Sequence, residues 1–196
     1  MIKFKVVIAG QKDVGKTSLL RRYATGKFDT STLSTIGVDF ETKKIMVDDA
    51  EILLNLWDFA GEKKFRTLFP SYVSGASGAL ILYDITSKDS LYDLESWMEV
   101  IDNVDNPPRT RILIENKIDL EDQREVTRKD AKKFHKKFKF KGDILGASAK
   151  TGENVENVFL TLGKEILKSS LRKCPNCGKH YPLELKFCQF CGTKTY

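Results

Sequence analysis

Short apolar runs alternate with amphipathic stretches along most of the chain, and polar or turn-forming residues separate them. Continuous apolar runs are typical of buried strands, whereas apolar positions three and four apart are typical of helices. The pattern predicts strands at about 3–9, 39–47, 52–58, 78–84, 111–116 and 144–148, and helices at about 16–24, 62–73, 87–103, 127–137 and 152–170. This alternation predicts an α/β fold in which helices flank a mostly parallel sheet.

One connection departs from the alternation of strands and helices. The segment Val47-Asp48-Asp49-Ala50-Glu51 is a polar turn between two strand-like runs, with no room for a helix. A short polar turn of this kind joins neighbouring antiparallel strands. We therefore expect the second and third strands to form an antiparallel hairpin.

The strongest motif lies between the first strand and the first helix, where residues 10–17 spell G-x-x-x-x-G-K-T. In the order strand, loop, helix this pattern predicts a phosphate-binding loop, and the flanking elements disfavour a chance match. Glycine backbone and the helix N-terminus direct N–H groups at an anion. Lys16 is expected at the β- and γ-phosphates and Thr17 at Mg²⁺. The loop residues expected to contact nucleotide are Asp13, Val14, Gly15, Lys16, Thr17 and Ser18.

A second motif follows the third predicted strand, which ends in Asp58-Phe59-Ala60-Gly61. A carboxylate at a strand end beside a phosphate-binding loop can hold Mg²⁺ through water, and the alternative for Asp58 is a helix cap. The Gly61 N–H can approach a γ-phosphate because no Cβ blocks it.

Base selection is predicted by two segments that follow the last two strands. Asp119, in Asn116-Lys117-Ile118-Asp119, can accept hydrogen bonds from guanine N1 and N2, where adenine has no donors. Asn116 and Lys117 would fix this loop and cover the base. Ser148, Ala149 and Lys150 follow the last strand and can present a backbone N–H to guanine O6.

Taken together, these motifs resemble those of Ras-superfamily small GTPases, and most closely the Rab branch. The Rab-like segments are Thr35–Phe40, Trp57-Asp58, Phe65-Arg66 and Leu82–Thr86. The resemblance covers about residues 3–168. It implies a P-loop NTPase G domain with a six-stranded sheet, GTP/GDP and Mg²⁺ binding, and two switch regions that contact effector and regulator proteins. It also implies that Thr35 is a ligand of Mg²⁺ whose N–H meets the γ-phosphate.

The same resemblance matches Phe28 to the aromatic residue that packs against guanine. The alternative is that Phe28 is a loop residue inserted into the core. By resemblance, the residues that act in hydrolysis are Lys16, Thr35, Gly61 and position 62.

Two residues differ from the family pattern at positions that affect GTP hydrolysis. Glu62 stands where the family carries a water-orienting glutamine, and Lys12 stands where glycine or another small residue is usual. Glutamine both donates and accepts hydrogen bonds, whereas an ionised glutamate only accepts and adds negative charge beside the γ-phosphate. We therefore expect slow hydrolysis. The alternatives are a Lys12–Glu62 pair that replaces the usual arrangement, or two side chains directed into solvent. Phe59, also unusual, is expected to stiffen the second switch.

Length and charge predict one domain with a small appendage. The chain has 196 residues and a net charge of +6, with 41% hydrophobic residues. We expect the GTPase domain over residues 1–170 and a separate tail over 171–196, where five basic residues against one acidic residue give +4. No apolar run is long enough to span a membrane, and the first strand leaves no room for a signal peptide. We therefore expect a cytoplasmic protein, with peripheral membrane association as the alternative.

All four cysteines lie in the tail, as CxxC-x10-CxxC with glycine after each pair: Cys174, Cys177, Cys188 and Cys191. Four thiolates in this spacing predict a closed tetrahedral Zn²⁺ site, and the pattern resembles a zinc ribbon. A module this small needs a metal to fold. Disulfides, a redox CxxC and iron are the alternatives, and His180 is a competing ligand.

The tail also bears on partners. It carries no prenylation pattern, so the zinc ribbon is a candidate docking module for protein. The basic stretch 128–141 is expected to be a solvated helix face, and the alternative is a surface for anionic lipid or an acidic partner.

We therefore expect a guanine-nucleotide switch, in membrane traffic or signalling by resemblance. A non-cycling GTP-bound scaffold that recruits partners through the ribbon is the second hypothesis. Nucleic-acid binding is the least favoured.

Overall fold

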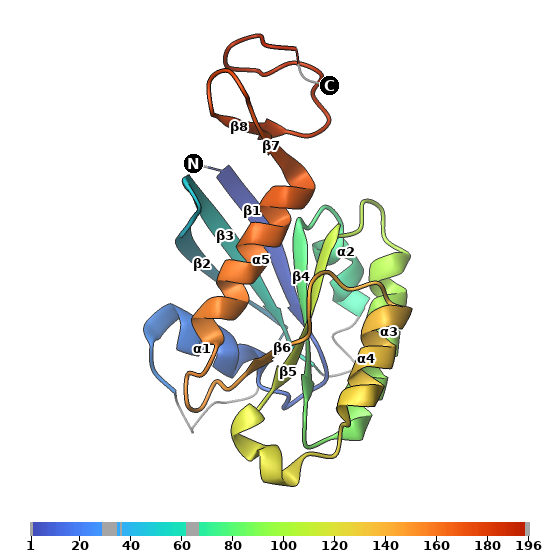
Figure 1. Ribbon diagram of the computed structural model, residues 1–196. Helices are drawn as coiled ribbons and strands as arrows, with labels where there is room; N and C mark the ends of the chain where they lie inside the picture. The colour runs from blue at the N-terminus through green and yellow to red at the C-terminus, as the bar shows by residue number, and fades with distance from the viewer. Residues whose placement is uncertain (1, 29–34, 36, 62–66, 195–196) are drawn as a thin grey trace.

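The computed structural model describes residues 2–28, 35, 37–61 and 67–194. These residues form a six-stranded sheet with helices on both faces, followed by a two-stranded hairpin (Figure 1). The elements are β1 (Ile2–Ala9), α1 (Lys16–Thr25), β2 (Val38–Val47), β3 (Ala50–Phe59), α2 (Phe69–Val73), β4 (Gly78–Asp84), α3 (Lys88–Asp102), β5 (Thr110–Asn116), the 3₁₀ segment η2 (Ile118–Gln123), α4 (Arg128–Lys137), β6 (Leu145–Ala147), α5 (Val155–Ser170), β7 (Leu171–Lys173) and β8 (His180–Pro182).

The six-stranded sheet has the order β2-β3-β1-β4-β5-β6. Only β2 and β3 run antiparallel, with Val47 paired to Ala50 across their turn, so the expected hairpin is confirmed. The other neighbouring pairs are parallel. Because carboxyl ends of parallel strands meet at one edge, the loops after β1, β3, β4, β5 and β6 come together there.

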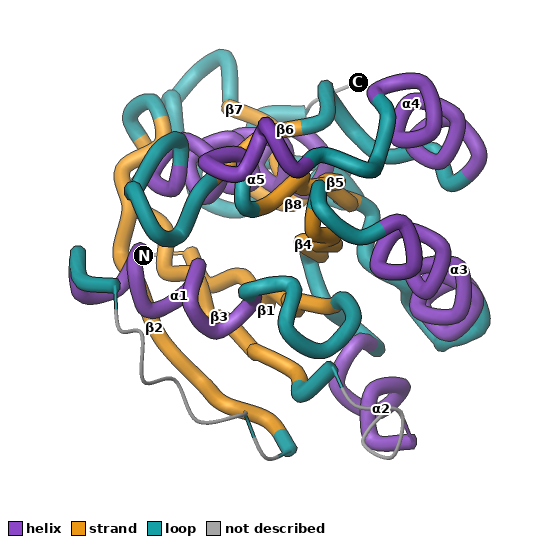
Figure 2. The backbone as a smooth tube through the Cα atoms, turned by 90° about the horizontal axis from the view of Figure 1, so that it is seen from below, coloured by secondary structure: helices purple, strands orange, loops and turns teal. Residues whose placement is uncertain are grey.

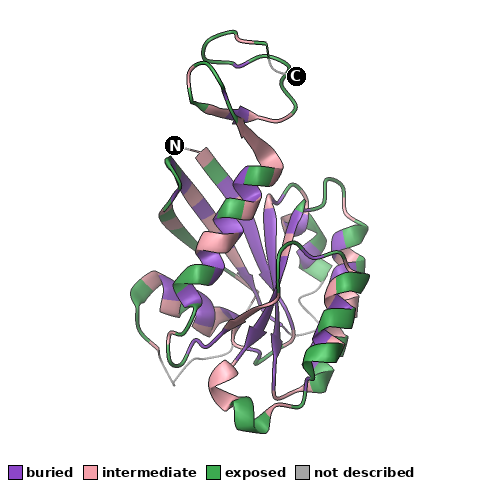
Figure 3. Cartoon of the chain, in the orientation of Figure 1, coloured by how far each residue is buried: buried purple, intermediate pink, exposed green. Residues whose placement is uncertain are grey.

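Both faces of the inner strands β1, β4 and β5 are covered, because successive strand residues point to opposite sides and both sets are mostly apolar, whereas the edge strand β2 is largely exposed. Val6 and Ile8 belong to the core under α1 and α5, whereas Val7 and Ala9 belong to the core under α2, α3 and α4. Figure 2 shows α3 and α4 on one side of the strands. Figure 3 shows the buried strands between helices whose outer faces are exposed.

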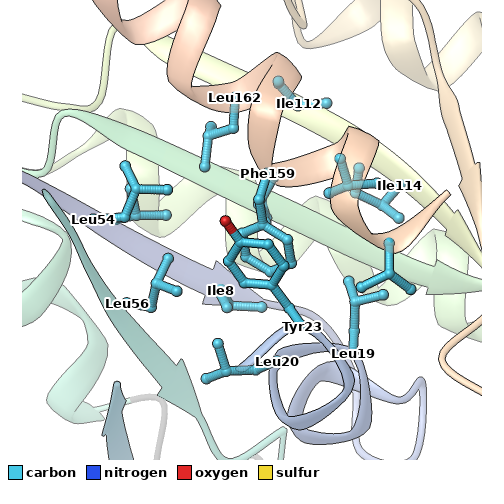
Figure 4. Close-up of a cluster of buried hydrophobic side chains, with 14 of the residues drawn as sticks. Ile8, Leu19, Leu20, Tyr23, Leu54, Leu56, Ile112, Ile114, Phe159 and Leu162 are labelled. Carbon is cyan, nitrogen blue, oxygen red and sulfur yellow. The ribbon is translucent and has the colours of Figure 1, made fainter. Parts of the chain in front are cut away.

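An aromatic pair fixes α1 to α5 in the first of these cores. Tyr23 stacks on Phe159, with ring centroids 3.8 Å apart and planes inclined by 9°. Leu19, Leu20 and Leu162 surround the pair (Figure 4). Tyr23 lies near the end of α1, so this packing fixes the helix whose first residue, Lys16, belongs to the predicted phosphate-binding loop.

The structure differs from the predicted elements in four places. The helix expected at 62–73 is helical at Phe69–Val73, and residues 62–66 lie outside the described part. The last strand is limited to Leu145–Ala147, and the last helix begins at Val155 because Gly152 and Asn154 have left-handed backbone conformations. The η2 segment was not predicted, since six residues give no helical period.

The tail continues from α5 without an intervening loop, because β7 begins at Leu171. Tyr181 is buried in the tail, and the Leu183 N–H donates to the Ser170 carbonyl at 3.0 Å. Figure 1 places this hairpin beside the N-terminus, at the end of the sheet opposite the carboxyl ends of the parallel strands. The expected division at residues 170 and 171 stays a prediction. Among the described helices, none combines the length and apolar character needed to cross a membrane.

The stacked pair predicts a stability effect. Phe159→Ala should lower the free energy of unfolding by about 3–5 kcal/mol, because it leaves a cavity beside Tyr23. Urea unfolding of the full chain would measure it. The control Tyr92→Ala removes a side chain that is 56% exposed, so it should change stability by about 0.5 kcal/mol or less. Equal effects of the two substitutions would contradict this account.

Candidate functional site

The loop between β1 and α1 has the backbone that the phosphate-binding motif requires. Asp13 and Gly15 have φ angles of 65° and 91°, both left-handed. The Lys16 side chain is buried, and its Nζ donates to the Gln11 carbonyl at 2.8 Å, so the ammonium lies over its own loop. A row of backbone N–H groups, the start of α1 and a buried ammonium together make this loop suited to a phosphate chain.

Gly61, after β3, lies against the same loop. A Cβ there would lie 2.2 Å from the Lys12 nitrogen, so only glycine fits. This contact brings the end of β3 to the phosphate-binding loop.

Three oxygen-bearing side chains meet beside Lys16. The Thr17 and Thr35 hydroxyls are 2.6 Å apart, and Thr17 also donates to Asp58 Oδ2. Asp58 is fully buried, and burial raises its pKa to about 6 against the opposing effects of the Thr17 hydrogen bond and Lys16. Its Oδ1 has no hydrogen-bond partner within the described part of the chain. An orphaned carboxylate oxygen beside two hydroxyls fits Mg²⁺, which prefers oxygen ligands.

The segment after β5 is held in place from three sides. Asn116 Nδ2 donates to the Val14 carbonyl at 2.7 Å, and Lys117 Nζ lies 2.6 Å from Asp84 Oδ2. The Ser148 hydroxyl, from the loop after β6, donates to Asp119 Oδ1 at 2.6 Å. The Asp119 carboxylate is therefore oriented before any ligand arrives, and its acceptors suit paired N–H donors.

These segments line one pocket of about 300 Å³. Its walls bring together the sequence-predicted residues Asp13, Gly15, Lys16, Thr17, Ser18, Phe28, Thr35, Gly61, Asn116, Lys117, Asp119, Ala149 and Lys150. Asp58 lies buried behind the wall formed by Thr17. Val14 and Ser148 are also buried and contact Asn116 and Asp119 instead. Glu62, Phe65 and Arg66 lie outside the described residues.

Phe28 lines the pocket and also packs against the core under α1 and α5, and its contact with guanine stays a prediction. Phe59 and Lys12, two departures from the family pattern, line the pocket as well. The Phe59 ring is buried and makes edge contacts with Phe69 and Tyr72, at 4.9 Å and 5.3 Å between centroids. It therefore joins the end of β3 to α2, and its expected stiffening of the second switch stays a prediction.

Sequence reasoning missed Leu120 and Ala60, which also line the pocket. Leu120 directly follows Asp119 and Ala60 directly precedes Gly61, so adjacency to a motif residue was the available signal. It also missed Gln11, whose carbonyl accepts from Lys16.

The four tail cysteines form a second cluster, with all four Sγ atoms within 4.8 Å of one another. The Cys174–Cys191 and Cys177–Cys188 sulfurs are each 3.6 Å apart, far beyond a disulfide bond of about 2.05 Å. Thiolates around Zn²⁺ at about 2.3 Å would lie about 3.8 Å apart, so the sulfur spacing fits a tetrahedral metal.

Two similar turns present these sulfurs. The Gly178 N–H donates to the Cys174 carbonyl at 2.9 Å, and the Gly192 N–H donates to the Cys188 carbonyl at 2.8 Å. His180 is not among the ligand atoms that gather there. The cluster is a candidate metal site made of cysteine alone.

Comparison with known proteins connects the pocket to a family. The family model described as Ras family matches residues 5–168. The chain is 37% identical over 170 residues to the Ras-related protein Rab-8B of Bos taurus, covering 87% of this chain and 81% of that protein. It is 38% identical over 169 residues to Rab-1C of Dictyostelium discoideum, covering 86% and 83%. It is 40% identical over 174 residues to Rab-1 of Theileria annulata, covering 88% and 78%. The family match ends before Cys174.

The orientation of Asp119 predicts a change of base preference. Asp119→Asn keeps the acceptor for Ser148 but places an amide N–H₂ against guanine donors, so GDP release should become about 100-fold faster. Xanthosine diphosphate has a carbonyl in place of the guanine amine, so it should bind the variant more tightly than it binds the parent chain. Release of fluorescent nucleotides measures both effects. The matched control Asp122→Asn makes the same change at an exposed residue, and it should alter neither GDP release nor xanthosine diphosphate binding. An unchanged base preference in Asp119→Asn would refute the assignment of Asp119 to the base.

Proposed function

The chain belongs to the Ras family of GTP-binding, GTP-hydrolysing enzymes, and on this premise we propose that it is a Mg²⁺-dependent switch with slow intrinsic hydrolysis. The observation that carries the proposal is the pocket in which residues of the phosphate-binding loop, the end of β3 and the base loop meet. Bound GTP would order the regions around residues 30–40 and 61–75, and effector and regulator proteins would bind these ordered regions. Hydrolysis would remove the γ-phosphate contacts and release the two regions.

Each wall of the pocket has its own task in this proposal. Lys16 and the backbone N–H groups of 13–18 bind the β- and γ-phosphates. Thr17 and Thr35 would hold Mg²⁺ directly, and Asp58 would hold it through water. Bound Mg²⁺ would neutralise charge on the phosphate oxygens. The close approach of Gly61 to the phosphate-binding loop supports a γ-phosphate contact from its N–H.

Base recognition is assigned to the opposite wall. Asp119 accepts from guanine N1 and N2, while Phe28 and the Lys117 stem cover the faces of the ring. The Ala149 N–H, between Ser148 and Lys150, meets guanine O6. The hydrogen bonds from Asn116 to Val14 and from Ser148 to Asp119 support this assignment, since they orient the base-binding groups.

Slow hydrolysis is proposed from the chemistry of Glu62. A glutamate cannot donate toward the transferring phosphoryl group, and its charge opposes the build-up of negative charge there. Lys12, which is exposed at the pocket wall, offers a cation in the same region. The Lys12–Glu62 pair stays the alternative mechanism, because a lysine ammonium at the pocket wall could supply positive charge to the phosphates.

The tail is proposed to be a zinc ribbon that docks protein partners. The sulfur spacing and the paired turns support Zn²⁺ as a structural ion, since four thiolates leave no open position for chemistry. The direct continuation of α5 into β7 supports docking at the end away from the pocket, where a partner can bind in either nucleotide state. Work in membrane traffic is proposed from the Rab relatives. A GTP-bound scaffold that does not cycle is the second candidate, and Glu62 is the observation that favours it.

Single-turnover hydrolysis tests the catalytic proposal. At saturating Mg²⁺, Glu62→Gln should raise the rate by about tenfold, because the amide can both hold the water and donate to phosphate. Glu51→Gln, an exposed change on β3, serves as control. A slower Lys12→Gly variant would instead support the Lys12–Glu62 pair. If neither the change at 62 nor that at 12 alters the rate, both mechanisms are wrong.

Metal analysis tests the ribbon. The purified chain should contain one Zn²⁺, and its four cysteines should resist a thiol reagent until a chelator is added. Cys188→Ser should lose the metal, while Ser169→Ala, outside the cluster, should retain it. GDP release should be unchanged after zinc removal, because the ribbon lies at the far end of the sheet. Metal-free protein with four freely reactive thiols would count against the proposal.

A further inference from the structure

Glu115 is a buried acidic residue near the carboxyl end of its strand, one position before Asn116. It lies on β5 and is only 9% exposed. Its register partners are Tyr83 on β4 and Gly146 on β6. A Cβ on Gly146 would lie 3.3 Å from Glu115 Oε1, so the glycine leaves room for the carboxylate.

Two side chains stabilise this buried charge. The Tyr83 hydroxyl donates to Glu115 Oε2 at 3.0 Å. Arg124 donates from Nη1 to Oε2 at 3.1 Å and from Nη2 to Oε1 at 3.4 Å. Both side chains of the ion pair are 12% exposed. A buried carboxylate is costly unless it is paired, and the planar guanidinium fork matches both of its oxygens.

The pair joins the two ends of one loop. Glu115 precedes Asn116, and Arg124 directly follows η2, so the residues between them include Lys117 and Asp119. The other edge of the Arg124 guanidinium binds Glu121 at 2.9 Å and 2.8 Å, within the same loop. Arg124 therefore connects the solvent side of the loop to the buried strand.

The loop needs such a connection, because part of its backbone is unfavourable. Lys117 has a φ angle of 64°, in the left-handed region, and Leu120 departs from helical angles inside η2. Non-glycine residues in sparsely populated conformations persist only where surrounding contacts hold them. The side chains of Asn116, Lys117 and Asp119 contact residues outside the loop, namely Val14, Asp84 and Ser148.

We propose that Glu115 and Arg124 are positioning residues for base recognition: their buried ion pair closes loop 116–123 and holds Asp119 against the base. Both the residence time of the nucleotide and the preference for guanine then depend on this pair. The proposal rests on the base site assigned above. It adds two residues that touch no ligand and act through the loop.

The test compares GDP with inosine diphosphate, which lacks the exocyclic N2 amine and so loses one hydrogen bond to Asp119. In the parent chain, GDP should be released more slowly than inosine diphosphate. Arg124→Met should speed GDP release about tenfold, equivalent to about 1.4 kcal/mol, and bring the two release rates close together. Arg124→Lys keeps the positive charge but loses the planar guanidinium, so the ratio of the two release rates should be intermediate. This variant also tests the proposal if Arg124→Met does not fold.

Three further variants separate positioning from plain stability. Glu121→Gln removes only the exposed partner of Arg124 and should leave the ratio of release rates unchanged. Leu162→Ala, in the core under α5, should lower the melting temperature and leave the ratio unchanged. Combining Arg124→Met with Glu115→Gln removes the unpaired buried charge, so it should recover melting temperature without recovering the ratio.

The proposal is overturned if the Arg124 variants lower the melting temperature as Leu162→Ala does while the ratio keeps its parental value. In that case the pair only stabilises the fold. A parent chain that fails to distinguish GDP from inosine diphosphate would instead refute the assignment of Asp119 to the base. The two failures are therefore distinguishable.

Discussion

The hydrogen bond from Asn116 Nδ2 to the Val14 carbonyl joins the two halves of the pocket, and the rest of the site depends on it. It connects residues 102 positions apart at 2.7 Å. It also explains Gly15, since a Cβ there would lie 2.5 Å from Asn116 Nδ2. This one contact fixes the phosphate-binding loop and the base loop relative to each other. A nucleotide whose phosphates bind the first loop therefore has its base next to the second.

Several polar side chains are buried at or beside the pocket, and burying such groups is unfavourable unless a ligand completes their hydrogen bonds. Lys16, Asp58 and Asn116 are all buried, and Asp58 Oδ1 and Asn116 Oδ1 have no partner among the residues described. Unsatisfied buried polar atoms are costly, so natural folds tolerate them mainly where a ligand, ion or water completes them. This is why the site supports nucleotide and Mg²⁺ binding more strongly than the motifs alone.

Much of this could be predicted from the sequence, because the motifs are local and each follows an apolar strand. The hairpin at Val47, the loop at Gly15 and the cysteine cluster required only spacing and chemistry. What the sequence could not reveal depends on contacts between distant segments. The shortened β6, the late start of α5 after the left-handed Gly152, and the Glu115–Arg124 pair are examples. Phe28 illustrates the same limit, since the sequence could not show that one side chain both lines the pocket and packs against the core.

The central claim is that one preformed pocket binds guanine nucleotide with Mg²⁺. The most direct measurement is release of fluorescent GDP from the purified full chain, chased with unlabelled GDP or ADP, with and without EDTA. The account predicts slow release that EDTA accelerates strongly, displacement by GDP, and no displacement by ADP at the same concentration. Equal displacement of fluorescent GDP by ADP, or a release rate that EDTA does not change, would contradict this account.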